Sequence, residues 1–376
     1  MELKEYTLYE LLPYEQPTKY IVESTKYDDS YETPVLTAGK SFILGYTDEK
    51  DGIFEKDRLP VLIFDDFTTA SQFVNFPFKV KSSAMKILNV NTELVLPKYI
   101  YYRMQIIQID HDTHKRYWIQ HYSKIKISIP SIDEQAKIVE KIEEIFSQID
   151  AGIKNLKKTK EQVEIYRQSV LISAFKEVSD KTETIENLCE SIVDCPHSTP
   201  KWSEEGRLCL RTSNFKRGYL DLSEKSYVTS EVYDERTARL IPKTGDVLYS
   251  REGSILGIAC IIPKGIEPCL GQRMMLFRTG KKINNLFLMH YLNSPIVTNH
   301  VIVSKGGTGS PHINVGDIKK FRIPLISYDN QLNIVKFIDE KLSVCDQIDK
   351  TIDNALIQAE ALRQSVLKKA FEGRLV

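Results

Sequence analysis

The sequence has no net charge and no long apolar stretch. Its 376 residues include 51 Lys and Arg against 51 Asp and Glu. Apolar runs such as 258–262 are far too short to span a bilayer. The start, residues 1–6, lacks the cationic and apolar regions of a secretory signal. These absences predict a soluble, cytoplasmic protein with no membrane partner, and charge neutrality argues weakly against a nucleic-acid partner.

Cysteine and histidine patterns typical of metal sites are also missing. The six cysteines form no C-x-x-C pair, and no His follows one of them at zinc-finger spacing. We therefore expect buried, reduced thiols and no bound metal. The segment 111–114, His-Asp-Thr-His, has too few ligands for a specific metal site, so a solvated loop is the simpler interpretation.

Catalytic signatures are absent as well. No Gly-x-x-x-x-Gly-Lys-Ser/Thr sequence is present, which excludes a P-loop motor. No cofactor-binding glycine turn or Ser/His/Asp arrangement is readable, so we expect neither intrinsic catalysis nor a cofactor in this chain. The glycine-rich segment 305–312 contains Thr308, Ser310 and His312. It is either a loop whose backbone approaches a ligand or phosphate, or a tight turn without a ligand.

What the sequence does contain is an internal repeat. Residues 135–175 align with residues 331–371 at one constant offset, and 17 of the 41 aligned positions are identical. Each copy follows an Ile-Pro step, at 129–130 and at 323–324. The chain is therefore a tandem duplication.

Both copies of the repeat have the composition of long helices. Lys, Glu, Gln, Ile and Leu dominate, and no Pro interrupts them. Interleaved apolar positions include Ile145, Tyr166, Ile348 and Leu362. A strict seven-residue apolar series runs through each copy: Ile142, Ile149, Leu156, Val163 and Val170 in the first, and Ile338, Cys345, Ile352, Ala359 and Val366 in the second.

The seven-residue series favours a coiled coil in which the two copies pair with each other. An amphipathic helix lying on a globular core is the alternative. A helix of about 40 residues is about 60 Å long, so such a pair would act as a spacer. If the helices are antiparallel, the domains at their ends are held apart and related by a pseudo-two-fold axis.

The remaining sequence predicts two α+β domains, each followed by a long helix. We expect a first domain over residues 1–130, a helix over 131–177, a second domain over 178–324 and a C-terminal helix over 325–376. Apolar strands that run into polar loops recur in the same order in both domains, at 59–68 and at 244–253. Residues 1–127 carry a net charge of −2 and residues 178–321 carry +3.

Several polar residues are candidates for DNA contacts. In the second domain Arg211 and Asn214 lie in a segment that mixes cations with an aromatic residue. Arg251 and Arg273 stand where apolar strands meet loops, so they either read bases in a groove or pair with a carboxylate such as Glu252. In the first domain the candidates are Asp65 and Asp66, as acceptors or as a plain turn, and as phosphate contacts Lys40, Lys79, Lys81, Lys115 and Arg116.

Taken together, this order resembles the DNA-specificity subunits of Type I restriction-modification systems. The resemblance covers essentially the whole chain. It is carried by the two helical blocks that end in Arg-Gln-Ser-Val-Leu-x-x-Ala-Phe and by the terminal segment 371–376. Motifs within the domains add Thr68, Ser250 and Gln272 to the candidate residues, from the segments 37–40, 63–69, 245–253, 270–273 and 306–309.

The resemblance implies two target-recognition domains on an antiparallel coiled coil, each reading one half of an asymmetric bipartite site in double-stranded DNA. The helices would set the gap and dock two methyltransferase subunits that carry S-adenosylmethionine. Restriction and motor subunits using ATP and Mg²⁺ would complete the complex, whose biological role is phage defence. The two domains diverge strongly, and Arg251 has no basic counterpart at 65–66, so the half-sites are expected to differ.

Two other functions remain open at this point. The neutral charge and the acidic first domain fit a module that binds protein or glycan instead of DNA. A self-contained methyltransferase is the third hypothesis, although no cofactor motif supports it.

Overall fold

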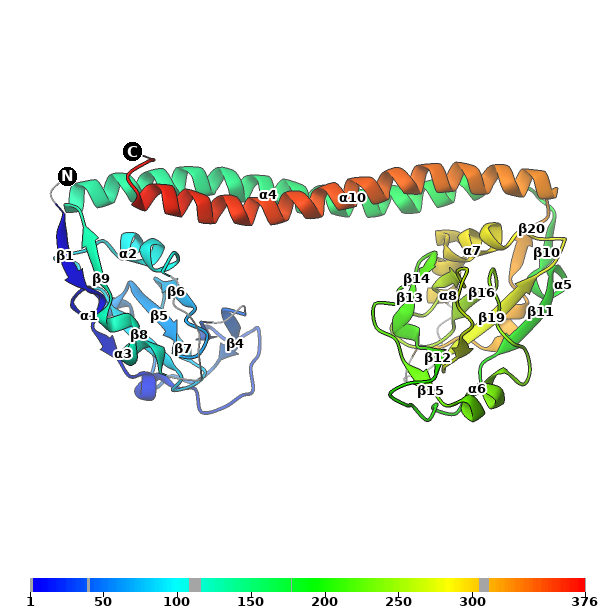
Figure 1. Cartoon of the computed structure of the whole chain (residues 1–376), viewed down its shortest axis with the longest axis horizontal. Helices are drawn as coiled ribbons and strands as arrows, with labels where there is room; N and C mark the ends of the chain where they lie inside the picture. Colours follow the sequence, from blue (N-terminus) through cyan, green and yellow to red (C-terminus); the bar gives the residue numbers. More distant parts are fainter. Residues whose placement is uncertain (1–2, 39–40, 108–115, 177, 304–310, 376) are drawn as a thin grey trace. The chain divides into compact units, whose positions relative to one another are not determined.

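The computed structural model describes residues 3–38, 41–107, 116–176, 178–303 and 311–375. The chain forms two compact units, one from Met1–Leu156 and Asn354–Val376 and the other from Lys157–Asp353. Each unit contains one globular α+β domain and a part of both long helices (Figure 1). The α+β class is confirmed. None of the helices in the described ranges combines the length and apolar character needed to cross a bilayer.

A four-stranded antiparallel sheet forms the centre of each globular domain. One inner strand of each sheet, 61–65 or 247–250, is apolar and buried over most of its length because both faces of the sheet are covered. In the first unit the spatial order is β2 (Tyr14–Glu15), β8 (Met85–Asn89), β5 (Val61–Asp65) and β6 (Ser71–Val74). In the second unit it is β11 (Cys189–Asp194), β19 (Met274–Thr279), β16 (Val247–Ser250) and β17 (Ala259–Ile261).

A smaller three-stranded sheet accompanies each central sheet. Its middle strand pairs antiparallel with one neighbour and parallel with the other, so two of its strands end at the same edge. The first unit has the order β4 (Ile43–Thr47), β3 (Thr33–Leu36) and β7 (Lys79–Val80). The second has β15 (Tyr227–Val228), β12 (Arg207–Leu210) and β18 (Cys269–Leu270).

A two-stranded ribbon leads into each long helix. The ribbons are β1 (Lys4–Thr7) with β9 (Lys126–Ile129), and β10 (Thr182–Thr184) with β20 (Arg322–Pro324). The first unit also has the helices α1 (Leu8–Leu11), α2 (Pro97–Met104) and α3 (Tyr117–Gln120). The second has α5 (Ile185–Leu188), α6 (Ser230–Thr237), α7 (Asn285–Asn293), α8 (Pro295–Val303) and α9 (Val315–Lys319), and the hairpin β13 (Phe215–Lys216) with β14 (Tyr219–Leu220).

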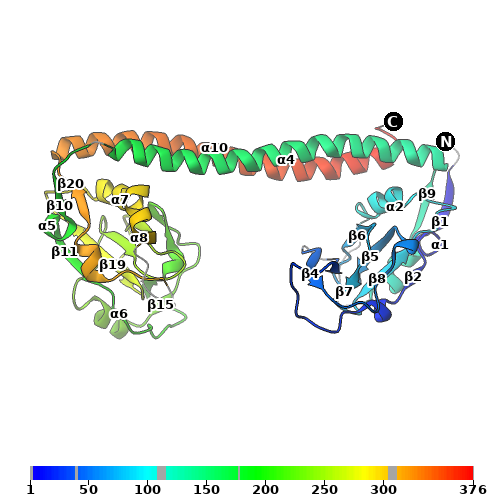
Figure 2. The same cartoon turned by 180° about the vertical axis from the view of Figure 1, so that it is seen from behind.

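The two long helices are α4 (Ile132–Phe175) and α10 (Tyr328–Phe371), as the repeat predicted. Within each unit they run antiparallel and side by side (Figure 2). In the first unit Arg363 pairs with Asp150 across the two helices. In the second unit Arg167 pairs with Asp346, and both of its residues are displaced by the repeat offset from the first pair. The duplication therefore extends to an individual ion pair.

The seven-residue series faces the partner helix. All ten of its residues are buried or half-buried, from Ile142 and Ile338 at 0% exposure to the half-buried Ile149, Leu156 and Ala359. The interleaved positions predicted from apolarity are partly wrong, because Tyr166, Ile348 and Leu362 are exposed. Arg167 and Arg363 each stand four residues after a member of the series and are half-buried. Their stems pack inward while their charges reach acidic partners.

A repeated glutamine ties each globular domain to its following helix. Gln135 accepts a hydrogen bond from the Leu96 amide at 2.8 Å and donates to the carbonyls of Leu94 and Pro130. Gln331 accepts from the Asn284 amide at 2.7 Å and donates to the carbonyls of Lys282 and Ile326. Both glutamines are buried, so these bonds satisfy backbone groups that water cannot reach.

The end of each long helix packs on a short helix in the same way. Phe175, at the end of α4, meets the rings of Phe287 and Tyr291 on α7. Phe371, at the end of α10, meets the ring of Tyr99 and the guanidinium of Arg103 on α2. Each globular domain thus contacts the start of one long helix and the end of the other within its own unit.

Candidate nucleic-acid interface

The two central strands end at equivalent points. Asp65 lies opposite Met85 in the first unit, and Ser250 lies opposite Met274 in the second. The next residues, Asp66 and Arg251, therefore occupy matching positions behind the polar loops. The sequence places opposite charges at one point of the same fold.

The side chain of Arg251 is engaged inside its own domain. It is 7% exposed, and its Nε atom donates to Oδ1 of Asp194 at 2.9 Å. Its Nη2 atom lies 3.4 Å from Oδ2 of Asp194 and 3.3 Å from Nδ1 of His197. The expected carboxylate partner, Glu252, instead lies 3.6 Å from Nε of Arg273. Of the two alternatives for Arg251, the structure thus shows pairing with a carboxylate, and that carboxylate is Asp194.

The side chain of Asp66 is enclosed in a comparable way. It is 3% exposed and accepts a hydrogen bond from the Trp118 amide at 2.7 Å. Nζ of Lys86, on the adjacent strand β8, lies 3.4 Å from its second oxygen and also donates to Oε1 of Gln16. Asp66 is therefore not an accessible acceptor for a base. Sequence reasoning found neither Lys86 nor Asp194, because both partners lie on strands that are far along the sequence from Asp66 and Arg251.

Segments that follow different strands of the second unit meet around Arg251. The Arg251 amide donates to the Arg273 carbonyl, and its own carbonyl accepts from the Ile313 amide, both at 3.0 Å. Nε2 of Gln272 donates to the His197 carbonyl at 2.7 Å. The structure thus brings Gln272, Arg273 and His312 to one surface, where Arg273 and His312 are exposed.

Two of the candidates behind this surface are structural. Ser250 is fully buried, and its hydroxyl donates to the Ile255 carbonyl and accepts from the Ile258 amide. Asn214 is also buried and bridges the Arg211 amide to the carbonyls of Asp221 and Glu224. Both side chains shape loops whose backbones lie near the surface.

Arg211 lies at the edge where β12 and β18 end together. Its guanidinium stacks over the ring of Trp202 at 5.0 Å, and both side chains are exposed. The Gly271 amide donates to the Leu210 carbonyl, so the segment with Arg211 runs beside the one with Gln272. A Cβ atom at Gly271 would lie 2.3 Å from that carbonyl, which explains the glycine. A stacked cation and an aromatic ring suit a nucleic-acid strand.

The lysine candidates of the first unit fall into different classes. Lys79 is 3% exposed, and its Nζ donates to the Asp51 carbonyl and pairs with Glu49, so its charge is engaged inside the domain. Lys81 is exposed and lies over the ring of Tyr27. Lys40 and Lys115 lie outside the described residues.

The loop after β5 keeps two exposed groups. Asp65 accepts hydrogen bonds from the amides of Phe67 and Thr68 at 2.8 and 3.2 Å, which makes it the turn residue of this loop. Phe67 and Thr68 are themselves exposed. The Tyr117 amide donates to the Asp66 carbonyl at 3.4 Å, which brings the exposed Arg116 beside this loop.

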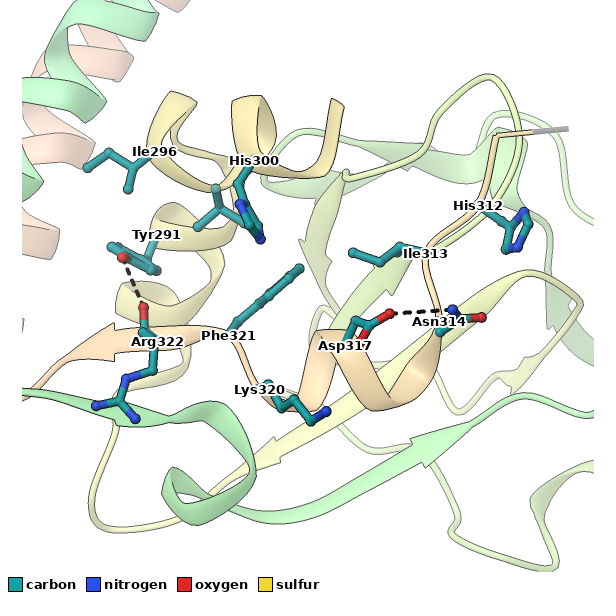
Figure 3. Close-up of a pocket in the computed structure, with 11 residues that line it drawn as sticks. Tyr291, Ile296, His300, His312, Ile313, Asn314, Asp317, Lys320, Phe321 and Arg322 are labelled. Atoms are coloured by element: carbon teal, nitrogen blue, oxygen red, sulfur yellow. Dashed lines mark hydrogen bonds between the residues drawn. The ribbon is translucent and has the colours of Figure 1, made fainter. Parts of the chain in front are cut away.

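The residues Thr308 and Ser310 lie outside the described part of the chain. Close to them in sequence, His312 lines a cavity of about 570 Å³ in the second unit (Figure 3). Its wall combines the rings of Tyr291 and Phe321 with the cations Lys320 and Arg322. The Tyr291 hydroxyl donates to the Arg322 carbonyl at 3.1 Å, and Asn314 donates to Asp317 at 3.4 Å.

No metal cluster is found within the described ranges, where no three His, Cys, Asp or Glu side chains converge. The six cysteines are free, and all but Cys189 are buried. Burial raises the pKa of the Cys195 thiol and raises the pKa of the Cys189 thiol to about 12. The thiols of Cys189 and Cys195 therefore stay protonated near neutral pH.

Comparisons with known proteins agree with this architecture. The family described as the Type I restriction modification DNA specificity domain matches residues 210–358. The EcoR124I/EcoR124II specificity subunit of a Type I restriction enzyme from Escherichia coli is 31% identical over 380 residues, covering 97% of this chain and 92% of the relative.

Two solved structures are similar in fold. One is a chain from a structure described as the basis of complex assembly and conformational transition of the type I R-M system. It matches with a TM-score of 0.71 and 14% identity, covering 99% of this chain and 98% of that one. The HsdS subunit from Thermoanaerobacter tengcongensis matches with a TM-score of 0.50 at 16% identity over 99% and 97%. With two duplicated α+β units and a relative of this identity and coverage, the chain belongs to the specificity subunits of Type I restriction enzymes.

Proposed function

We propose that each globular domain of this chain reads one half of a split site in double-stranded DNA. The observation that carries the proposal is the opposite charge at matching positions, Asp66 with Lys86 and Arg251 with Asp194. The same scaffold thus holds its polar loops with different residues in the two domains. The half-sites are accordingly different in sequence.

In this proposal the long helices set the gap between the half-sites and dock two methyltransferase subunits. Those subunits supply S-adenosylmethionine, and restriction and motor subunits supply ATP and Mg²⁺ chemistry. The complex acts in the cytoplasm. The solved chain with a TM-score of 0.71 comes from work on the assembly of a type I R-M system, which supports an assembled complex here.

The residues proposed to face DNA are those that the structure leaves exposed near the loops. In the second unit they are Arg211, Arg273 and His312, with Gln272 half-buried beside them. In the first unit they are Thr68, Lys81 and Arg116. The candidates Lys40, Lys115, Thr308 and Ser310 stay in the proposal as predictions from sequence. Asp66, Lys79, Ser250 and Arg251 act from behind the surface.

Selection from a random-sequence duplex library tests the proposal. The chain is assembled with the proposed methyltransferase subunits, and bound duplexes are sequenced. We expect one enriched motif made of two unlike halves at a fixed gap. Enrichment of no motif, or of one uninterrupted motif, would contradict the proposal.

Paired variants assign each half to a domain. Arg273→Ala should relax selection in one half only, and Thr68→Ala should relax selection only in the other half. Affinity falls as the salt concentration rises. Each lost phosphate contact should make the slope of log affinity against log salt shallower by about 0.9. Affinity that is independent of salt would instead support a protein- or glycan-binding module.

A further inference from the structure

Arg236 is a buried cation without a carboxylate partner. It lies in the last turn of α6 and is 7% exposed. The ion pairs formed within the described ranges include those of Arg251 and Arg278 in the same unit but none of Arg236. Because an arginine side chain stays protonated, its charge is compensated only by hydrogen bonds to neutral groups.

Those hydrogen bonds all go to backbone carbonyls of two loops. Nε donates to the Leu270 carbonyl and Nη2 to the Gly271 carbonyl, both at 2.7 Å. Nη1 donates to the Ser198 carbonyl at 3.2 Å, and Nη2 also to the Pro196 carbonyl at 3.4 Å. Arg236 thus clamps the loop after β11 to the loop after β18.

The clamp decides where the opposite ends of these peptides point. In a trans peptide the N–H group points away from the C=O group, and the peptide bonds of these two loops are trans. With the carbonyls of Pro196, Ser198 and Gly271 turned inward, the amides of His197, Thr199 and Gln272 are turned away from Arg236. None of these three amides donates to an acceptor in the described part of the chain, and His197 and Thr199 are exposed.

An exposed cation stands next to one of these amides, because Arg273 follows Gln272 directly and is 52% exposed. Two carboxylates of the same loops are paired, Asp194 with Arg251 and Glu252 with Arg273. A third acidic residue, Glu235, precedes Arg236 on α6 and is exposed. Outward amides above an uncompensated buried cation form an electropositive surface that favours an anion.

We propose that Arg236 is a positioning residue that holds the amides of His197, Thr199 and Gln272 against a backbone phosphate of the second half-site. The proposal rests on the proposed function, because it takes the anion to be a DNA phosphate. Arg236 does not touch DNA itself. It sets the geometry of two loops that carry both the phosphate contact and the exposed Arg273.

The experiment uses the assembled complex and the duplex that the wild-type protein selects. Arg236→Met keeps the length of the side chain but removes all its donors, and Arg236→Lys keeps the charge with fewer donors. Arg239→Met is the matched control, because Arg239 is an exposed arginine on the same segment. Duplexes with a neutral methylphosphonate at one position at a time locate the phosphate.

We expect Arg236→Met to make the slope of log affinity against log salt shallower by about 0.9. We also expect that one methylphosphonate within the second half-site, which weakens binding of the wild-type complex, no longer weakens binding of this variant. Arg236→Lys should restore part of both effects, and Arg239→Met should change neither. Selection in the first half-site should remain as in the wild-type protein.

Three outcomes would overturn the proposal: an unchanged salt slope in a folded Arg236→Met complex, equal loss in both half-sites, or no sensitive phosphate in the second half-site of the wild-type complex. Thermal unfolding of each variant shows whether it folds. If Arg236→Met does not fold, the wild-type phosphate scan and Arg236→Lys decide the question. A wild-type complex that selects no split site would contradict the proposed function, which is a separate result.

Discussion

The first and second units differ in the sign of the buried charge at the point where their central strands end. The first unit encloses an acidic side chain there, Asp66, with Lys86 as its partner. The second encloses a basic one, Arg251, with Asp194 as its partner. Away from this point the units agree in the order of both sheets, in the parallel strand pair and in the ribbon that leads into each long helix.

This difference teaches that charge inside a domain can invert while the fold stays the same. A buried ion pair requires that both charges be present, whichever strand carries which sign. The groups that anchor the long helices have no such freedom, because Gln135 and Gln331 complete backbone hydrogen bonds of fixed geometry. The helix-anchoring half of the repeat is therefore duplicated closely, and the loop-bearing half diverges.

The largest expected effect concerns the apolar seam of the long helices. Ile142→Ala and Ile338→Ala each remove a fully buried side chain at matching positions of the two units. We expect each to lower the free energy of unfolding by about 3 kcal/mol because a cavity remains. Denaturant unfolding followed by circular dichroism measures both values.

The exposed Ile357 in the first unit and Ile165 in the second are matched controls. Their replacement by Ala should change the free energy of unfolding by less than about 0.5 kcal/mol. If the two buried variants differ by more than about 2 kcal/mol, the two seams are not equivalent.

A smaller effect is expected at the repeated glutamines. Gln135→Leu and Gln331→Leu retain most of the side-chain volume but leave a backbone amide and two carbonyls without their partner. We expect a loss of about 2 kcal/mol in each unit. Amide hydrogen exchange should rise at Leu96 in the first variant and at Asn284 in the second. Exchange that rises in both units of either variant would show that the anchor is not local.

The smallest effect is expected at the repeated ion pairs between the helices. Arg167 and Arg363 are partly buried, but the carboxylates of Asp346 and Asp150 are largely exposed. We expect Arg167→Met and Arg363→Met each to cost no more than about 1 kcal/mol, less at high salt. Unfolding at low and high ionic strength measures this. If only Arg167→Met lowers the free energy of unfolding, the ion pairs of the two units are not equivalent. The reason would be that Arg167 also pairs with Asp349.

Much of the fold could be predicted from local sequence patterns. The two helices followed from the repeat and its seven-residue series, and the seam residues are buried or half-buried as a coiled coil requires. The charged positions of the seam were missed because Arg167 and Arg363 look like surface residues in a sequence, although their stems are partly buried.

The candidate DNA-contacting residues were harder to judge. Arg251 and Arg273 look alike in sequence, since each stands at the junction of a strand and a loop. The structure buries the first against Asp194, 57 residues away, and leaves the second half exposed. Arg236 had no sequence signal, because an arginine in a polar helix normally faces solvent.

The sequence by itself determined that the protein is one α+β unit with a long helix, written twice, because repeats and helical periodicity depend on residues close together in the chain. Only the tertiary structure decided which polar side chains are accessible and which hold loops in place. Accessibility depends on partners from distant strands, as Lys86 is for Asp66 and the Leu270 and Gly271 carbonyls are for Arg236. Burial of a charge requires such a partner, and no local pattern reveals it.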